Sequence, residues 1–171
     1  GDFQVRYENR VDFESGDSDG ESMRLRIGIQ YEVNDQLEIG TRIVTGDEGN
    51  PRSADVDFSD FFDGFPLSLD TLYLTYTPNR YEDLWVTVGK FMHPQYFNPV
   101  YGGLVWDGDI QPEGIAAGYS FGDAGQLTAG YYLLEEEGSN GEDDTTILQL
   151  QYANSYEVSE DTTLDFALGY T

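Results

Sequence analysis

A strict alternation of apolar and polar residues between Met23 and Val33 constrains the fold of this chain more than any other feature. Every second residue of this segment is apolar, and the residues between are arginine, glutamine, glutamate or glycine. Side chains at a period of two lie on one face of a β-strand, whereas on a helix they would spread around the axis. The segment is therefore predicted to be a strand with one apolar face.

Similar runs recur along the whole chain and predict about nine antiparallel strands in total. They cover residues 3–13, 23–33, 37–43, 69–77, 84–91, 114–121, 126–134, 145–156 and 163–170. The connections between them alternate in length, with short turns at 34–36, 78–83, 122–125 and 159–162 and long polar connections at 14–21, 46–66, 92–112 and 135–144. Tight periplasmic turns and longer extracellular loops are typical of outer-membrane barrels. The expected fold is all-β, an antiparallel up-and-down transmembrane β-barrel.

The composition narrows the range of functions. The net charge of -25 arises from 33 acidic and 8 basic residues, so the chain should be repelled by nucleic acids. The aromatic content of 15% argues against disorder, and the chain has no cysteine to form a disulfide or a thiolate metal site. His93 is the single histidine, and no motif places a nucleophile beside it. Enzymatic activity is not expected.

Two sets of motifs in the sequence can be compared with a known family. The first set is Gly89-Lys90-Phe91-Met92-His93-Pro94, followed by Trp106-Asp107-Gly108-Asp109 and Pro112-Glu113-Gly114. The second set is Arg24-Leu25-Arg26-Ile27-Gly28 and Gly40–Gly46. The first set resembles a bacterial family known as the putative porins, and the second set is similar to the first hairpin of that family. The family-motif residues in and beside the connection at 92–112 are Lys90, Trp106, Asp107, Asp109, Pro112, Glu113 and Gly114.

This resemblance implies a water-filled channel for passive diffusion of small hydrophilic solutes or ions in the outer membrane of a Gram-negative bacterium. The implied partners are outer-membrane lipid, lipopolysaccharide and the small solutes, with a homotrimer as one expected assembly. Residues 1–171 would form a single barrel domain. Because the sequence ends inside the strand-like run before Thr171, we expect it to be part of a longer porin.

The arginines occupy the polar face of the first three predicted strands. They are Arg6, Arg10, Arg24, Arg26 and Arg42. In a barrel these strands are neighbours, so the guanidinium groups would line one part of the pore and attract anionic solutes. Alternatively, the acids on the same face neutralise the arginines in pairs. These acids are Glu8, Asp12, Glu32 and Glu38. The predicted pore-lining residues are the five arginines together with Glu8, Glu32 and Glu38.

Most acidic residues lie in the long connections. Clustered carboxylates on loops are suited to Ca²⁺ or Mg²⁺, and such ions could bridge the loops to lipopolysaccharide. The candidate ligands are Asp17, Asp19, Glu21, Asp55 and Asp57, and no other cofactor is expected. The alternative is a solvated acidic surface. Because acidic loops and inner arginines have opposite effects on passing ions, the sequence leaves the ion selectivity open.

The aromatic residues suggest two further features. Those near the short turns would form a girdle at the membrane interface. They are Phe3, Tyr31, Tyr76, Tyr81, Trp85, Phe121 and Tyr156. Residues 46–66 and 92–112 also carry aromatics, and one of these loops could fold inward as a constriction or pack over the rim of the barrel.

Two other functions are compatible with the same pattern. One is a secreted, soluble β-sandwich that binds carbohydrate or calcium. The other is a barrel that serves as a structural sleeve for a partner protein at the cell surface.

Overall fold

The computed structural model of the chain describes residues 1–11, 18–46, 53–58, 64, 66–95, 106–135 and 145–171. Its strands are β1 (Asp2–Arg10), β2 (Ser18–Asn34), β3 (Leu37–Thr45), β4 (Val56–Asp57), β5 (Leu67–Tyr76), β6 (Leu84–Lys90), β7 (Glu113–Ser120), β8 (Gln126–Glu135), β9 (Thr145–Ser159) and β10 (Thr162–Tyr170). A single turn of 3-10 helix, η2 (Gly122–Ala124), joins β7 to β8. No helix among these residues is long and apolar enough to span a membrane.

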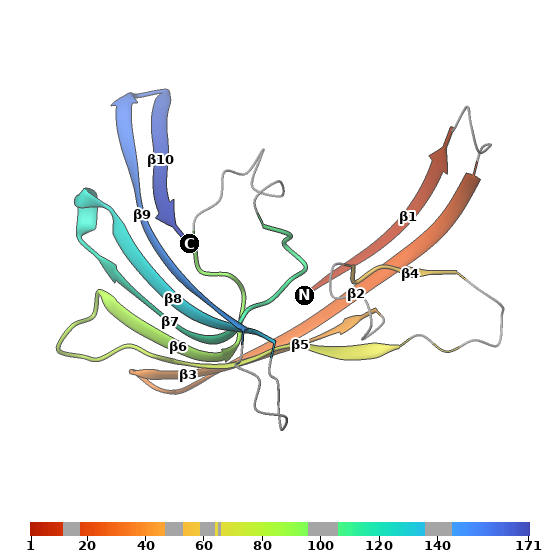
Figure 1. Cartoon of the computed structure of the whole chain (residues 1–171), viewed down its shortest axis with the longest axis horizontal. Coiled ribbons are helices and arrows are strands. Elements are labelled where there is room, and N and C mark those ends of the chain that lie inside the picture. Colours follow the sequence, from red (N-terminus) through yellow and green to blue (C-terminus); the bar gives the residue numbers. More distant parts are fainter. Residues whose placement is uncertain (12–17, 47–52, 59–63, 65, 96–105, 136–144) are drawn as a thin grey trace.

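The strands form one antiparallel 10-stranded sheet in the order β1-β2-β3-β5-β6-β7-β8-β9-β10, with the short β4 paired to β2. The sheet bends into a deep trough whose two edges are β1 and β10 (Figure 1). Successive strands are neighbours throughout, as in an up-and-down barrel that has not closed in this structure. A sandwich would need two sheets packed face to face, so this architecture differs from the sandwich alternative.

The nine predicted strands and the four short turns are confirmed, although the bounds differ by a few residues. The predicted connection at 14–21 is wrong in its second half, because β2 begins at Ser18 and pairs with β1 from there onward. β4 was not predicted. It lies within the long connection at 46–66, and Val56 and Asp57 pair with Met23 and Ser22. A strand of two residues is too short to show any periodicity.

The two faces of the sheet differ in the way the alternation predicts. Apolar side chains point outward from the convex face, where Ile29 is 65% exposed and Leu168 is 74% exposed. On the concave face the buried residues are mostly polar, and Thr71 and Thr128 are only 2% and 3% exposed. This is the reverse of a soluble protein, whose buried positions are largely apolar.

Aromatic rings lie over glycines on the concave face. A Cβ atom added to Gly118 would come within 2.5 Å of the Trp85 ring, and one added to Gly40 would collide with Tyr73. Both pairs are cross-strand neighbours, Trp85 with Gly118 and Gly40 with Tyr73. Each glycine therefore leaves the space that the ring on the next strand occupies.

The position of Trp85 corrects its predicted place in an outward-facing aromatic girdle. Trp85 packs against a small cluster of buried residues, Phe91, Ala116 and Tyr132, on the concave side. The predicted girdle residues Tyr31, Tyr76, Tyr81, Phe121 and Tyr156 are exposed near the short turns. Phe3 does not lie there, because β1 pairs it with Leu25, far along β2 from the turn.

Candidate functional site: the concave polar face

The arginines of β2 and β3 come together on the concave face. Arg24 and Arg26 share this face of β2, and Arg42 of β3 lies opposite Gly28 in the next pair of the ladder. Arg6 lies on the same face of β1, because β1 and β2 pair Arg6 with Ser22 and Asp2 with Arg26. Arg10 ends β1, but its side chain lies outside the described residues.

Each described arginine of this face is paired with an aspartate. Arg6 contacts Asp55 at 2.5 Å, and Arg24 donates to Asp2 through Nε at 3.2 Å and through the terminal nitrogen at 3.1 Å. Arg42 donates to Asp70 through Nε. These pairs join β1, β2, β3, β5 and the connection that contains β4. The guanidinium charges are thus balanced locally.

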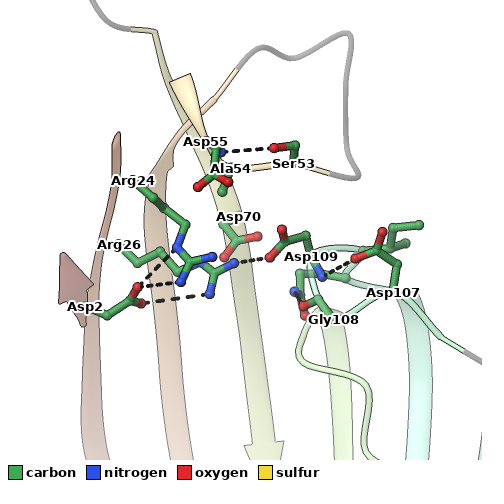
Figure 2. A network of polar contacts seen from close by, with 12 residues as sticks. Asp2, Arg24, Arg26, Ser53, Ala54, Asp55, Asp70, Asp107, Gly108 and Asp109 are labelled. Carbon is green, nitrogen blue, oxygen red and sulfur yellow. Dashed lines mark hydrogen bonds and ion pairs between the residues drawn. The ribbon is translucent and has the colours of Figure 1, made fainter. Parts of the chain in front are cut away.

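Arg26 lies at the centre of a larger network (Figure 2). It contacts Asp109, 83 residues away in the chain. A terminal nitrogen of Arg26 also lies 3.9 Å from the carboxylate of Asp2, which accepts hydrogen bonds from Arg24. The side chain of Arg26 is only 15% exposed. Because a charge-assisted bond is stronger away from water, the Arg26–Asp109 pair fixes the segment around Asp109 against the strand wall.

The partners of Arg6, Arg24, Arg26 and Arg42 are aspartates that were not among the pairing acids considered from the sequence. The sequence suggested Glu8, Asp12, Glu32 and Glu38, whereas these four arginines contact Asp2, Asp55, Asp70 and Asp109. Asp12 lies outside the described residues. The signal for Asp70 was present in the sequence, since it is a lone carboxylate inside an apolar strand, next to the bulge where β3 and β5 shift register.

Two of the predicted pore-lining acids face each other without an arginine. Glu32 of β2 and Glu38 of β3 are direct partners in the ladder, on the concave face and next to the short turn at Asp35–Gln36. Tyr73 donates its hydroxyl to Glu38 at 3.3 Å and accepts a bond from Gln30 at 3.0 Å. Among the described contacts neither carboxylate forms an ion pair.

The second described part of the connection from β6 to β7, residues 106–112, lies against the concave face (Figure 2). Trp106 donates its indole N–H to the Ile110 carbonyl at 2.9 Å, and the Asp107 carboxylate accepts the backbone N–H of Asp109 at 3.0 Å. Gln111 donates to the Gly108 carbonyl at 3.0 Å. These local bonds shape the Trp-Asp-Gly-Asp segment so that the Asp109 carboxylate points to Arg26 (Figure 2).

The start of the same connection is held by His93. Its ring lies 4.3 Å from the Trp106 ring and 5.5 Å from the Tyr132 ring, measured between centroids. One ring nitrogen lies 2.8 Å from the amide oxygen of Gln149 on β9. Burial lowers the pKa of His93 below its usual 6.5, and the hydrogen bond with Gln149 opposes this effect only in part. The sequence analysis assigned His93 no such role.

A cavity of about 350 Å³ lies between the wall and this connection. Its lining includes Arg26, Asp70, Lys90 and Asp109, with two positive and two negative charges, and hydroxyl groups of Thr45 and Ser68. Both hydroxyls already donate to backbone carbonyls, of Ala54 and Gly46 respectively. The cavity is therefore polar but electrically balanced.

The remaining motif residues hold the ends of β6 and β7 together. Lys90 and Glu113 are ladder partners, and their charged groups are 2.7 Å apart. Pro112 is buried, and its carbonyl accepts the backbone N–H of Phe91 at 3.1 Å. Gly114 has a φ of 149°, and a Cβ there would collide with the backbone of β8, so the motif requires glycine at this position.

The candidate metal ligands are scattered. Asp55 is engaged by Arg6, Asp19 accepts the hydroxyl of Tyr7 at 3.5 Å, and Asp57 lies in β4. Glu21 pairs in register with Tyr7. Within the described ranges no three acidic or histidine side chains gather closely enough to hold a metal ion. Asp17 lies outside those ranges.

Comparison with known proteins gives one result that bears on the whole chain. A family model described as "putative porin" matches residues 1–170. No curated protein matches the sequence.

Proposed function

Because the chain belongs to the putative porin family, we propose that it forms a water-filled channel for passive diffusion across the bacterial outer membrane. The observation that carries the proposal is the inversion of the two faces. An apolar convex face suits contact with lipid, and a concave face with paired charges, threonines and glutamines suits contact with water.

The two kinds of connection support an orientation in the membrane. The short turns lie along the left side of Figure 1, and the opposite ends of the same strands lie toward its centre and right. In outer-membrane barrels short turns are periplasmic and long loops are extracellular. We therefore place the turns at Asp35–Gln36, 77–83, 121–125 and 160–161 on the periplasmic side.

The β6–β7 connection is proposed to narrow the channel. Its described parts, residues 91–95 and 106–112, lie inside the trough in Figure 1, and the Arg26–Asp109 pair and the His93 contacts attach them to the wall at two separate places. Of the two roles that the sequence left open for a long loop, these contacts favour an inward constriction over packing on the rim.

Planar-bilayer recording of the detergent-extracted full-length protein tests the proposal. Discrete conductance steps that grow with salt concentration are expected, because ions would move through a water-filled passage. Removal of the loop's anchor by Asp109→Ala should increase the size of the step. A correctly folded protein that gives no steps at any voltage or salt concentration would contradict the proposal.

A further inference from the structure

We infer that this channel passes cations in preference to anions, because most carboxylates at the short-turn end of the described wall have no basic residue to balance them. The inference rests on the proposed channel function and addresses the selectivity that the sequence left open. It concerns the field along the passage and assigns no fixed binding site.

The first step is that the arginines contribute little net positive field. The pairs of Arg6, Arg24, Arg26 and Arg42 with aspartates place a negative charge within 4.0 Å of each guanidinium group. Opposite charges at such a distance largely cancel for an ion several ångströms away. A positive pore wall that guides anions is thus not supported by these contacts.

The second step is that the short-turn end carries acids almost alone. The turns themselves contribute Asp35, Glu82, Asp83, Asp123, Glu160 and Asp161. Arg80 is the single basic residue at this end of the described chain. Its guanidinium group lies 5.5 Å from the centre of the Tyr81 ring, and no ion pair to these acids occurs among the described contacts.

The third step is the pair formed by Glu32 and Glu38 inside this end of the trough. Like charges that lie directly opposite each other in a ladder destabilise a sheet. The hydroxyl of Tyr73 donates to Glu38, but no guanidinium or ammonium group forms an ion pair with either carboxylate within the described structure. Mobile cations from solution are the remaining source of compensating charge.

Carboxylates that ring one end of a passage raise the local concentration of cations and lower that of anions. The effect reaches about 10 Å at 0.1 M salt and shortens as salt is added. We therefore expect the selectivity to be strongest in dilute salt. Addition of a polyvalent cation to the short-turn side should weaken it more than addition to the other side.

The test is the reversal potential of the full-length protein in a planar bilayer with a tenfold gradient of KCl, which gives the permeability ratio PK/PCl. The wild-type ratio should exceed one. The double variant Glu32→Gln/Glu38→Gln should lower it about twofold to fivefold, since two charges are removed close to the ion path. The variant Glu82→Gln/Asp83→Asn lowers the ratio in the same direction without altering the β2–β3 ladder.

Asp57→Asn is the matched control, because it removes one carboxylate from exposed β4 at the opposite end of β2. It should leave the ratio nearly unchanged. A ratio at or below one overturns the cation preference. A ratio above one that neither double variant lowers overturns the assignment of that preference to these carboxylates. In both cases the channel itself stands. A folded wild-type protein without conductance steps overturns the channel function, and the cation preference with it.

Discussion

At the scale of single residues, the contacts between rings and glycines on the concave face predict where a methyl group can be added. Gly118→Ala places a Cβ 2.5 Å from the Trp85 ring, so the ring must move. We expect a loss of about 1–3 kcal/mol in the free energy of unfolding, as for other overpacked positions. Urea unfolding in lipid vesicles, followed by tryptophan fluorescence, measures this loss.

Gly28→Ala is the control, because its added Cβ would lie 3.4 Å or more from every neighbour and its φ is not positive. Alanine also suits a strand slightly better than glycine does. Its stability should therefore equal or slightly exceed that of the wild type. Equal losses in the two variants would show that the Trp85 ring does not depend on the missing side chain of Gly118.

His93 predicts a dependence of loop attachment on pH. Its pKa in the attached loop lies below 6.5 because burial disfavours the charged ring, so a proton binds more tightly once the loop is released. The contribution of His93 to attachment is therefore complete above pH 6.5 and declines as the pH falls from there toward the lowered pKa.

Fluorescence of Trp106 reports this change directly, since its ring lies against His93. In a Trp85→Phe background, which leaves Trp106 as the single tryptophan, we expect an emission change with a midpoint below pH 6.5. His93→Gln should abolish the change. A midpoint above pH 6.5 would contradict the direction assigned to the pKa.

Periodicity was sufficient to assign most residues to a face but not to find their partners. In β6 the aliphatic residues at 84, 86 and 88 define the outer face, and the same alternation places Trp85 inward, against the preference of aromatics for the interface. The partner of Arg26, by contrast, lies 83 residues away. No local pattern in the sequence encodes a contact that depends on how a whole connection folds.

At the scale of elements, the Arg26–Asp109 pair should account for a measurable part of the attachment of the β6–β7 connection. Removal of either partner leaves a charge in a poorly solvated position, so Arg26→Gln and Asp109→Asn should each speed proteolysis of this connection. In a double-mutant cycle the two changes should be coupled by about 1–3 kcal/mol.

Glu113→Gln is the matched control for that cycle. It removes the carboxylate from the Lys90–Glu113 pair, which joins the ends of the same connection but is more exposed, with Glu113 at 57%. Exposed pairs contribute roughly 0–1 kcal/mol, so proteolysis should change little. Additive effects of the Arg26 and Asp109 variants would mean that the pair does not attach the connection.

The elements show the same division between what is local and what is not. Strands and turns follow from the alternation of residues and from the glycine, proline and asparagine at the turns, so they were predicted well. The inward position of residues 91–95 and 106–112 was left open, because the side chains that hold them, His93 and Asp109, contact β8, β9 and β2, far along the chain. The extension of β2 to Ser18 was not predicted, because acidic residues such as Asp19 and Glu21 are more typical of a loop than of a strand.

At the scale of the whole molecule, the contrast between the two faces predicts that an added charge destabilises the protein at one position and has little effect at the next. Ile29 lies on the convex face of β2, opposite Thr41 of β3, and the next residue, Gln30, lies on the concave face. Arginine in contact with lipid near the midplane of a bilayer costs about 2–4 kcal/mol, whereas arginine in a water-filled lumen costs little.

Ile29→Arg should therefore reduce the stability of the membrane-inserted protein by that amount, and Gln30→Arg should change it by less than about 1 kcal/mol, including the lost bond to Tyr73. Refolding into vesicles, followed by the shift in gel mobility between folded and unfolded forms, measures both. Similar losses for the two variants would show that the convex face does not contact lipid.

The pairing of β4 with β2 affects how freely the long connection between β3 and β5 can move. Val56 pairs with Met23, Asp55 binds Arg6, and Phe58 donates its backbone N–H to the Glu21 carbonyl at 2.9 Å. These contacts divide one closed loop into two shorter ones. The entropy of loop closure rises with the logarithm of length, and each doubling costs only about 0.6 kcal/mol. Extra residues inserted on one side of β4 would therefore cost little free energy of loop closure, and the conformational freedom on the other side of β4 would be unchanged.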